Sequence, residues 1–508
     1  MDTLKAPMAA DALPAARAHR IDPADHVATA LADIADGQAV EVGGRRLVAR
    51  ADVPKGHKIA VEAVVAGERV LKFGHPIGVA TDQIAPGDHV HVHNVRTALG
   101  GGEAYTPPAA WTRPSVPVEG PVFQGYRRAD GRVGTRNEIW ILCTVGCVAN
   151  TARRIAEQAG RRFAGRVDGV HAFPHPFGCS QLGDDLDGTR ALLAALAAHP
   201  NAGGVLILGL GCESNQLAAL LASMEGREPS RLRAFASQEV EDELEAGLAA
   251  VAELVAVAER DRREPRPLSD LVLGVKCGGS DGFSGLTANP LVGRLADRVA
   301  EAGGTPVLTE IPEIFGAERL LMQRATGPEV FDDLVELVNG FKRYFTDHGE
   351  PVSENPSPGN IAGGITTLEE KSLGAVQKGG HAPVAQVLRY GERARGPGLA
   401  VLEAPGNDAV SSTALTAAGC TVILFTTGRG TPLGFPVPTL KIASNSGLAA
   451  RKPAWIDFDA GPIVEGEPLD AAAGRLLDVV IATASGQPVK AELNGEREIA
   501  IWKRGVTL

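Results

Sequence analysis

The segment Val275-Lys276-Cys277-Gly278-Gly279-Ser280-Asp281-Gly282-Phe283-Ser284-Gly285-Leu286-Thr287-Ala288-Asn289-Pro290 joins an apolar run, 271–275, to a stretch of helical periodicity that begins at Leu291. It combines a thiol, a carboxylate, hydroxyl groups and an amide with glycines that allow a ligand to approach the backbone. In open α/β sheets, ligands bind outside the carboxyl ends of the strands. The segment therefore predicts a binding site for a small polar substrate. The alternative is a glycine-rich turn with a buried cysteine.

From about residue 121, apolar runs typical of strands alternate with helical patterns. The runs are 139–142, 169–173, 204–208, 271–275, 306–309, 399–402 and 420–425. The main helical patterns are 151–158, 189–198, 216–224, 240–263, 291–302 and 331–345. This alternation predicts an α/β protein with mostly parallel sheets. We expect two α/β lobes, 121–265 and 266–508, the last of them Rossmann-like; one large sheet is the alternative.

The first part of the chain has a different pattern. Short β segments and turns between residues 21 and 97, with a short helix at 28–34, predict a small β-rich domain. We interpret residues 1–20 as a flexible tail, because they lack the apolar core and cleavage pattern of a signal peptide. Glycine and proline cluster without hydrophobic periodicity at 98–120, which predicts a linker.

Histidines alternate near the end of this β-rich region. His89, His91 and His93 would face one side of a strand, and Asn94 follows them. Three imidazoles on one face could bind a metal or line an anionic pocket; the alternative is a solvated edge strand. His57-Lys58 adds an imidazole and a cation on a loop, although a lone histidine there is more often structural.

Four of the six cysteines follow predicted strands directly, near helix starts that favour a thiolate. They are Cys147, Cys179, Cys212 and Cys277. If these strand ends converge, the thiols are soft ligands suited to iron or an iron–sulfur cluster. The alternative is that they are small buried hydrophobic residues.

Further polar residues follow other predicted strands. His175 could act as a base or a ligand, and Glu310 and Glu313 could do the same or be solvated acids. Arg429 lies in a glycine-rich loop and could bind a carboxylate with two hydrogen bonds. The long loop from Asn355 is of the kind that covers an active site.

Composition limits the possible partners. The chain has 508 residues and a net charge of −11 without a long basic run, which argues against nucleic acid. No span of about 18 apolar residues occurs, so we expect no membrane helix. Six cysteines without a close-spaced framework favour reduced thiols in a cytoplasm.

These motifs together resemble the altronate/galactarate dehydratase family, which also includes sulfolactate sulfo-lyase. The resemblance runs from about residue 22 to residue 508. It is carried by 56–58, 89–94, 126–131, 144–147, 175–179, 209–213, 277–281, 355–360 and 427–432. The histidine triplet and the run 455–461 resemble the altronate branch.

The resemblance implies a SAF (β-clip) domain at 21–97 and a hydro-lyase acting on a sugar acid. In the altronate branch the reaction converts D-altronate to 2-dehydro-3-deoxy-D-gluconate in hexuronate (galacturonate) catabolism. It also implies iron as the activating metal, most simply Fe²⁺, with Mn²⁺ as a substitute or a labile iron–sulfur cluster as the alternative. We expect a homodimer.

Removing a proton next to a carboxylate requires a nearby cation, and the departing hydroxyl requires an acid. Our hypothesis places the metal on Cys147, Cys179, Cys212 and Cys277. The catalytic candidates are His175, His57 and Asp281. The substrate-binding candidates are Lys58, His89, His91, His93, Asn94, Ser280, Arg429 and Thr431.

Other functions are compatible with the same residues. Within enzymes, the alternatives are dehydration of galactarate or another sugar acid, and C–S cleavage of sulfolactate. A sugar-acid-binding protein without catalysis is a different class. The run Gly209-Leu210-Gly211 hints at a nicotinamide dehydrogenase, but Ser214 replaces the third glycine of that fingerprint.

Overall fold

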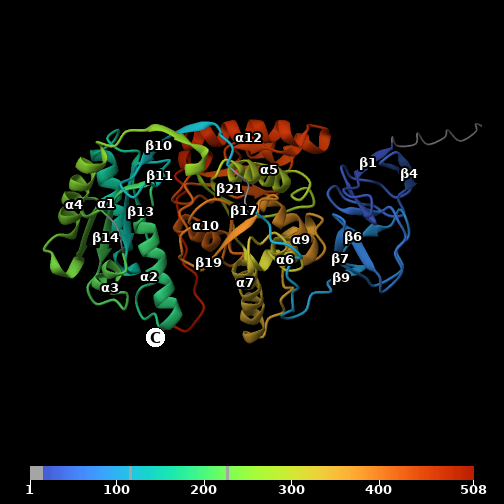
Figure 1. Cartoon of the computed structure of the whole chain (residues 1–508), viewed down its shortest axis with the longest axis horizontal. Helices are drawn as coiled ribbons and strands as arrows, with labels where there is room; N and C mark the ends of the chain where they lie inside the picture. Colours follow the sequence, from blue (N-terminus) through green and yellow to red (C-terminus); the bar gives the residue numbers. More distant parts are fainter. Residues whose placement is uncertain (1–14, 114–116, 225–227) are drawn as a thin grey trace, which may run out of the picture.

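The structure is a computed structural model that describes residues 15–113, 117–224 and 228–508. Figure 1 shows a β-rich N-terminal domain at the right, a lobe with a seven-stranded sheet in the middle and a lobe with a four-stranded sheet at the left. The predicted α/β fold with an N-terminal β-rich domain is confirmed. Within the described ranges, no helix is long and apolar enough to cross a membrane.

The N-terminal domain contains a six-stranded and a three-stranded sheet. Its strands are β1 (Ala16–His19), β2 (Val27–Ala30), β3 (Ala39–Val42), β4 (Arg45–Val48), β5 (Lys58–Ala60), β6 (Arg69–Lys72), β7 (His75–Ala80), β8 (His89–Val90) and β9 (Val95–Arg96).

Two expectations for this domain are wrong. The predicted helix 28–34 begins instead within β2, a fully buried strand that pairs with β1 and β5. Tertiary pairing on both sides outweighs the weak local helical pattern there. The predicted tail 1–20 contains β1, which also pairs with β3. The first 14 residues of that tail lie outside the described residues.

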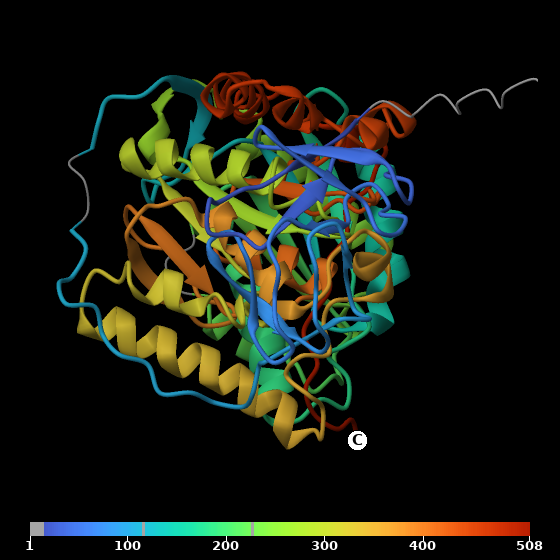
Figure 2. The same cartoon turned by 90° about the vertical axis from the view of Figure 1, so that its right-hand side faces the viewer.

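The first part of the predicted linker packs against the C-terminal lobe. Asn339, on α7 (Pro328–Asp347), accepts a hydrogen bond from the Glu103 N–H at 3.1 Å and donates one to its carbonyl at 2.9 Å. Figure 2 shows the segment 98–113 passing around the side of the molecule next to this long helix. The segment is therefore extended but held by specific contacts.

The four-stranded sheet is parallel, with the order β13-β12-β14-β15. Its strands are β12 (Glu138–Cys143), β13 (Gly169–Phe173), β14 (Ala202–Gly209) and β15 (Leu232–Ala236). Its helices are α1 (Ala149–Arg162), α2 (Gly183–Ala197), α3 (Leu217–Ala222) and α4 (Glu243–Ala258). The last of these begins where the Asp242 side chain accepts hydrogen bonds from two backbone N–H groups of the first turn.

A small three-stranded sheet adjoins this lobe. It consists of β11 (Val133–Gly134), β10 (Val122–Arg127) and β16 (Glu264–Pro267). The predicted boundary near residue 265 therefore falls within a strand. Its prolines are tolerated because β16 lies at the edge of the sheet.

The seven-stranded sheet is also parallel, with the order β19-β20-β18-β17-β21-β22-β23. Its strands are β17 (Val272–Cys277), β18 (Thr305–Leu308), β19 (Val384–Leu388), β20 (Leu399–Leu402), β21 (Val422–Thr427), β22 (Thr439–Ala443) and β23 (Phe458–Asp459). The helices besides α7 are α5 (Ala288–Glu301), α6 (Glu318–Met322), α8 (Pro358–Ala362), α9 (Leu368–Ala375), α10 (Asp408–Ala417), α11 (Ser446–Arg451), α12 (Leu469–Ala484) and α13 (Lys490–Leu493).

This strand order indicates where along the sheet a ligand would bind. From β20 to β23 it is the Rossmann order 3-2-1-4-5-6, and the chain direction across the sheet reverses between β17 and β21. Ligands bind in the crevice at such a reversal. The segment 278–287 follows β17 directly at that position.

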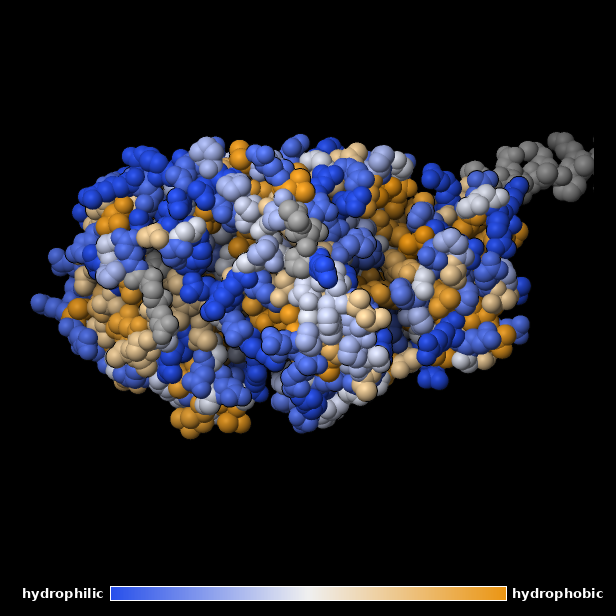
Figure 3. Space-filling view, in the orientation of Figure 1, coloured by the Kyte–Doolittle hydropathy of each residue, from blue (hydrophilic) through white to orange (hydrophobic). Residues whose placement is uncertain are grey.

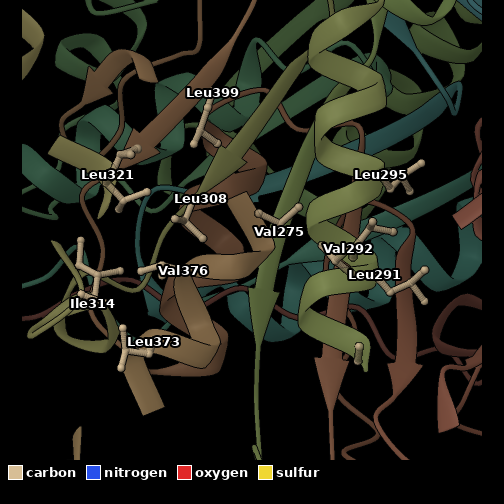
Figure 4. Packing of buried hydrophobic residues seen from close by; sticks show 14 of the residues in the cluster. Val275, Leu291, Val292, Leu295, Leu308, Ile314, Leu321, Leu373, Val376 and Leu399 are labelled. Atoms are coloured by element: carbon tan, nitrogen blue, oxygen red, sulfur yellow. The ribbon is translucent and has the colours of Figure 1, made fainter. Parts of the chain in front are cut away.

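The C-terminal lobe and the N-terminal domain share one buried apolar core. Figure 4 shows Leu291, Val292 and Leu295 of α5 beside Val275 of β17, with Leu308 on the other side of that strand. Ile77 and Val90 of the N-terminal domain belong to the same cluster. Figure 3 shows a mostly hydrophilic face, with hydrophobic residues visible where this domain meets the lobe. The shared core fixes the domain against the carboxyl ends of the seven-stranded sheet.

Candidate active site

The loop 353–367 connects the predicted site residues of the N-terminal domain with those of the C-terminal lobe. Three successive carbonyl groups, 362–364, contact in order His57 Nε2 at 3.5 Å, the Gly282 N–H at 2.7 Å and Lys58 Nζ at 2.7 Å. The loop that the sequence predicted to cover an active site therefore forms a wall shared by both parts.

Four histidines gather beside this loop. The ring centroid of His57 lies 5.2 Å from that of His89 and 4.6 Å from that of His91, and the His89 centroid lies 5.3 Å from that of His93. His57 Nδ1 and His89 Nε2 are 3.0 Å apart. His91 Nδ1 lies 3.2 Å from the hydroxyl of Thr366 in the loop. The predicted cluster is thus present and includes a fourth imidazole.

The predicted cause of this cluster is wrong. The strand β8 ends at Val90, and the chain then turns. Asn94 fixes the turn, because its Oδ1 accepts the His91 N–H and its Nδ2 donates to the His89 carbonyl, both at 2.9 Å. Both polar groups of Asn94 are therefore used by the backbone. In this structure it positions the histidines, and its predicted contact with a substrate stays a prediction.

Burial favours the neutral form of His57, His89 and His91. It lowers the pKa of His89 to about 4 and that of His91 to about 3, and neighbouring Lys58 and His57 lower both further. Burial also lowers the pKa of His57. Neutral imidazoles have free lone pairs, which suit them to accept a proton or to bind a metal.

Lys58 lies beneath the histidines and is fully buried. Its ammonium group is 2.9 Å from Glu370, and Lys72 is 2.8 Å from the other oxygen of that carboxylate. Burial lowers the pKa of Lys58 to about 8, against the opposing effect of Glu370. Although burial opposes ionisation, the two lysines lower the pKa of Glu370 to about 2. Lys58 therefore joins the domain to the lobe, and its predicted direct contact with a substrate is not supported.

Asp281 accepts several hydrogen bonds at the end of the loop after β17. Ser284 donates from its N–H and its hydroxyl, both at 2.9 Å, Ser444 donates at 2.8 Å and Asn445 at 3.0 Å. Burial raises the pKa of Asp281, and these hydrogen bonds oppose that shift. The carboxylate therefore shapes the loop, with Oδ2 bound by Asn445 alone among the described residues, and its predicted catalytic role stays a prediction.

Two glycines allow the backbone to approach closely around Asp281. A Cβ atom on Gly282 would lie 2.0 Å from the Gly56 carbonyl oxygen, and one on Gly428 would lie 2.2 Å from the Asp281 Cγ. Only glycine fits at either position. The glycines of the central motif thus bring the N-terminal domain and the β21 loop against Asp281.

Ser280 is buried and contributes its carbonyl group to the same network. Asn360 Nδ2 donates to that carbonyl at 2.9 Å, and Asn360 Oδ1 accepts from Lys371 Nζ at 3.1 Å. Ser357 and Asn360 cap each other at the start of α8. Local capping therefore orients the amide that links the loop to the charged cluster behind it.

Cys277 lies in a compensated charge network. Lys378 Nζ is 2.8 Å from the Cys277 sulfur and 2.9 Å from Glu310. The thiol donates to Glu313 at 3.4 Å, and Lys371 is 2.9 Å from that carboxylate. Burial and the nearby Glu310 raise the pKa of Cys277 to about 12. Lys378 and Lys371 oppose this shift, and the net direction favours the protonated thiol.

The helix start expected near Cys277 is displaced along the chain, because the next helix, α5, begins only at Ala288. Cys277, Glu310 and Glu313 are nonetheless the set in the described chain whose ligand atoms lie within 4.8 Å of one another. Since their partners are buried ammonium groups and the pKa shift favours the protonated thiol, this set does not fit a divalent cation as it is folded.

Arg429 and Thr431 lie on the loop after β21. Arg429 is exposed, and its Nη1 lies 3.4 Å from the Gly359 carbonyl, a weak contact that leaves the guanidinium available for a carboxylate. The Thr431 hydroxyl accepts the Leu433 N–H at 3.3 Å and so stabilises its own loop. Arg429 keeps its predicted role as a binding candidate, and Thr431 has a structural contact.

The other three candidate thiols belong to a different sheet. Cys147, Cys179 and Cys212 are exposed and follow strands of the four-stranded lobe, at the opposite end of the molecule from the N-terminal domain (Figure 1). Their loops are neighbours, as the Gly146 N–H donates to the Phe177 carbonyl. Strand ends converge only within one sheet, so the predicted site of four thiols is wrong.

His175 lies in that lobe and is buried. Its Nε2 donates to the Cys143 carbonyl at 2.8 Å, and its Nδ1 accepts the Phe177 N–H at 3.2 Å. Because both ring nitrogens bind backbone groups, the structure does not support the predicted role as catalytic base. Pro174 and Pro176 flank it, and the ring holds the turn in shape.

Sequence reasoning missed the charged residues of α9. All eight residues of that helix are buried, including Glu369, Glu370 and Lys371. Glu369 accepts hydrogen bonds from Thr97 and the Ala98 N–H. The available signal was three consecutive charges in a short helix directly after a predicted covering loop.

The chain matches three family models over most of its length. They are the Altronate/galactarate dehydratase SAF domain at 16–98, the D-galactarate dehydratase/Altronate hydrolase second domain at 125–259 and the D-galactarate/Altronate dehydratase C-terminal domain at 268–507. Their limits agree with the three bodies of the structure.

Curated relatives give the same result. Altronate dehydratase of Escherichia coli (strain K12) is 50% identical, and that of Bacillus subtilis (strain 168) is 48% identical; each alignment covers 96% of this chain and 99% of the relative. Galactarate dehydratase (L-threo-forming) of Escherichia coli (strain K12) is 35% identical over 86% of both chains. The chain therefore belongs to the altronate/galactarate dehydratase family.

Proposed function

We propose that this chain is a hydro-lyase that dehydrates D-altronate to 2-dehydro-3-deoxy-D-gluconate, a step of hexuronate (galacturonate) catabolism. The observation that carries the proposal is its identity of about half to two altronate dehydratases over nearly their whole length. The lower identity to galactarate dehydratase favours altronate as the substrate.

The reaction removes the C2 proton and the C3 hydroxyl group of the sugar acid, and the enol that results becomes a 2-oxo acid. The histidine cluster, the Asp281 loop and Arg429 lie around one loop, so one substrate could contact all three. Arg429 would bind the substrate carboxylate. His57 would accept the C2 proton, since it is neutral and its Nε2 has only a long contact at 3.5 Å.

For iron, we favour the histidine cluster on donor chemistry, although the Cys277 set is the one described above with ligand atoms within 4.8 Å of one another. No buried ammonium group in the described residues is bound to the imidazoles, whereas Lys378 and Lys371 bind the Cys277 set. His89 and His91, whose pKa burial lowers, would be the ligands, and His57 would stay off the metal and act as the base. When bound, Fe²⁺ or its substitute Mn²⁺ would stabilise negative charge on the substrate. The exposed thiols of the other lobe are the alternative ligands, for a labile cluster.

An anaerobic assay with ferrous iron tests the function. The purified protein is offered altronate, galactarate and sulfolactate in parallel, and 2-oxo acid formation and sulfite release are measured. We expect product from altronate. A higher kcat/KM for galactarate or sulfolactate would overturn the substrate assignment, and binding without turnover of any substrate would indicate a sugar-acid-binding protein.

Substitution of His91 by alanine tests the site, with the exposed His75→Ala as the matched control. We expect His91→Ala to lower kcat at least 100-fold and to reduce bound iron, while His75→Ala leaves both unchanged. Iron lost from a Cys147→Ser variant but retained in His91→Ala would instead place the metal on the thiols.

We also propose a homodimer, which sedimentation equilibrium of the metal-loaded protein would test. A monomer mass near the 52.7 kDa of the chain at assay concentration would contradict it.

A further inference from the structure

A basic cavity lies between the two α/β lobes, away from the candidate active site. Its volume is about 690 Å³, and its charged lining consists of five arginines and two acids: Arg128, Arg132, Arg231, Arg393, Arg395, Asp130 and Glu228. The first three arginines belong to the four-stranded side of the molecule, and Arg393 and Arg395 belong to the loop between β19 and β20. Such a concentration of guanidinium groups contrasts with the net charge of −11 of the whole chain.

The arginines of this cavity are not equally neutralised. Arg128 forms an ion pair with Asp261 at 2.7 Å, and Arg132 forms one with Asp130 at 2.5 Å. Arg132 Nη1 is buried but has no hydrogen-bond partner in the described chain.

Two arginines on the other wall lack acidic partners. The described residues place no carboxylate oxygen within 4.0 Å of Arg393 or Arg395. Burial, together with the positive charges of Arg132 and Arg395, lowers the pKa of Arg393, and the more distant Asp130 opposes this shift. The cavity therefore contains mutually repelling cations with unused donor capacity.

The position of the cavity separates it from catalysis. His199 and Pro200 line it and precede β14, while Arg393 and Arg395 precede β20, so the cavity lies at the amino ends of both parallel sheets. The candidate active site lies past the carboxyl end of β17. A six-residue strand spans about 20 Å, which separates the two edges.

We infer that this cavity binds a small multivalent oxyanion, a metabolite with a phosphate group or several carboxylates, between the two lobes. Planar guanidinium groups bind both kinds of oxyanion with paired hydrogen bonds. One ligand that contacts Arg132 from one lobe and Arg393 from the other would stabilise their mutual arrangement, because it binds only the assembled form.

Isothermal titration of the full chain with pyrophosphate, and separately with citrate, tests the inference. Sodium chloride of equal ionic strength is the control for screening. We expect saturable binding of at least one anion, with the stronger one identifying phosphate or carboxylate chemistry, and a rise of the melting temperature in its presence. Absence of saturable binding of both at millimolar concentration would overturn the proposal.

Variants locate the binding. Arg393→Ala/Arg395→Ala removes two arginines without ion-pair partners, so we expect folding to be retained and the affinity to fall at least 10-fold. Arg154→Ala, which removes an exposed arginine of α1, is the matched control and should not change it. Unchanged affinity in the double variant, or loss of binding in Arg429→Ala instead, would contradict this site. Because the experiment measures anion binding, its result does not depend on whether the protein dehydrates altronate.

Discussion

The carboxyl ends of the two parallel sheets contain similar residue types but differ in their surroundings. At the four-stranded sheet, three thiols at the strand ends are exposed, and the buried groups nearby are the neutral His175 and two carboxylates, Glu213 and Asp185, that accept hydrogen bonds from backbone N–H groups instead of pairing with buried lysines. At the seven-stranded sheet, the N-terminal domain and the loop 353–367 cover the strand ends, and the buried groups are ions. Whether a residue at a strand end can act as a ligand therefore depends on which segments cover that strand end.

The buried ion network explains this difference energetically. Lys276, Lys371 and Lys378 face Glu310, Glu313 and Asp408, so three ammonium groups are matched by three carboxylates. Transfer of such charges into the interior is tolerated only when each has a close partner. The exposed thiols of the other sheet need none.

The largest predicted effect comes from breaking the network. Lys378→Met removes the cation shared by Cys277 and Glu310, and we expect the free energy of unfolding to fall by about 3–5 kcal/mol. Urea unfolding followed by circular dichroism measures it. Arg161→Met, which breaks an exposed pair with Glu157, is the control and should have no measurable effect. If both variants were equally stable, burial under the N-terminal domain and the loop 353–367 would not make the charges at the seven-stranded sheet more important than exposed ones.

The two lobes should lose stability in different pH ranges. Burial lowers the pKa of His199, at the four-stranded side, to about 3, while the unfolded value is near 6.5. The unfolded chain then binds the extra proton, so this stability is complete above pH 6.5 and decreases by about 2 kcal/mol on going to pH 5. Glu370, with a pKa of about 2, contributes a loss only below about pH 4.5.

Unfolding of wild type and His199→Gln at pH 7 and pH 5 checks this sign. We expect a smaller pH dependence in the variant between these values. A wild-type stability that is unchanged down to pH 5 would show that His199 does not titrate with the folded lobe.

A smaller effect is expected at the histidine turn. Asn94→Ala removes the two hydrogen bonds that hold His89 and His91, at a cost of about 1–3 kcal/mol, because the His91 N–H is left without its partner. We expect kcat to fall with it, whereas Asn94→Asp, which keeps the acceptor for the His91 N–H, should recover part of both. Full activity in the alanine variant would separate the turn from catalysis.

We expect the smallest effect on stability at the carboxyl end of the four-stranded sheet. Cys147→Ser should change the free energy of unfolding by less than about 0.5 kcal/mol, because the side chain is exposed. In the metal-free protein, Ellman's reagent should react at once with Cys147, Cys179 and Cys212, and with Cys143, Cys277 and Cys420 only after unfolding. More than three fast-reacting thiols would contradict the described burial.

The sequence predicted the features that depend on local pattern. Strand ends at 275, 309 and 425 follow from apolar runs that give way to glycine and polar residues, and the structure has strands ending within two residues of these positions. The cysteines at strand ends were also placed correctly along the chain. What failed was their convergence, because the local pattern does not specify which sheet a strand joins.

The histidine cluster shows a second limit. Alternate spacing looks the same in a strand and in a turn, so His89 and His91 were grouped for the wrong reason. Glu370 was missed because its partners, Lys58 and Lys72, lie about 300 positions away along the chain. Three adjacent charges in one short helix do not by themselves indicate burial, because the sequence does not show which surface packs against the helix.

The helix α9 holds the N-terminal domain and the C-terminal lobe together. Glu369 binds the end of the N-terminal domain, Glu370 its interior, and Lys371 the C-terminal lobe. A protease that nicks the chain between residues 98 and 113 would therefore not release the small domain. The severed pieces should elute together, because parting them would separate the buried ammonium groups of Lys58 and Lys72 from the Glu370 carboxylate that neutralises them.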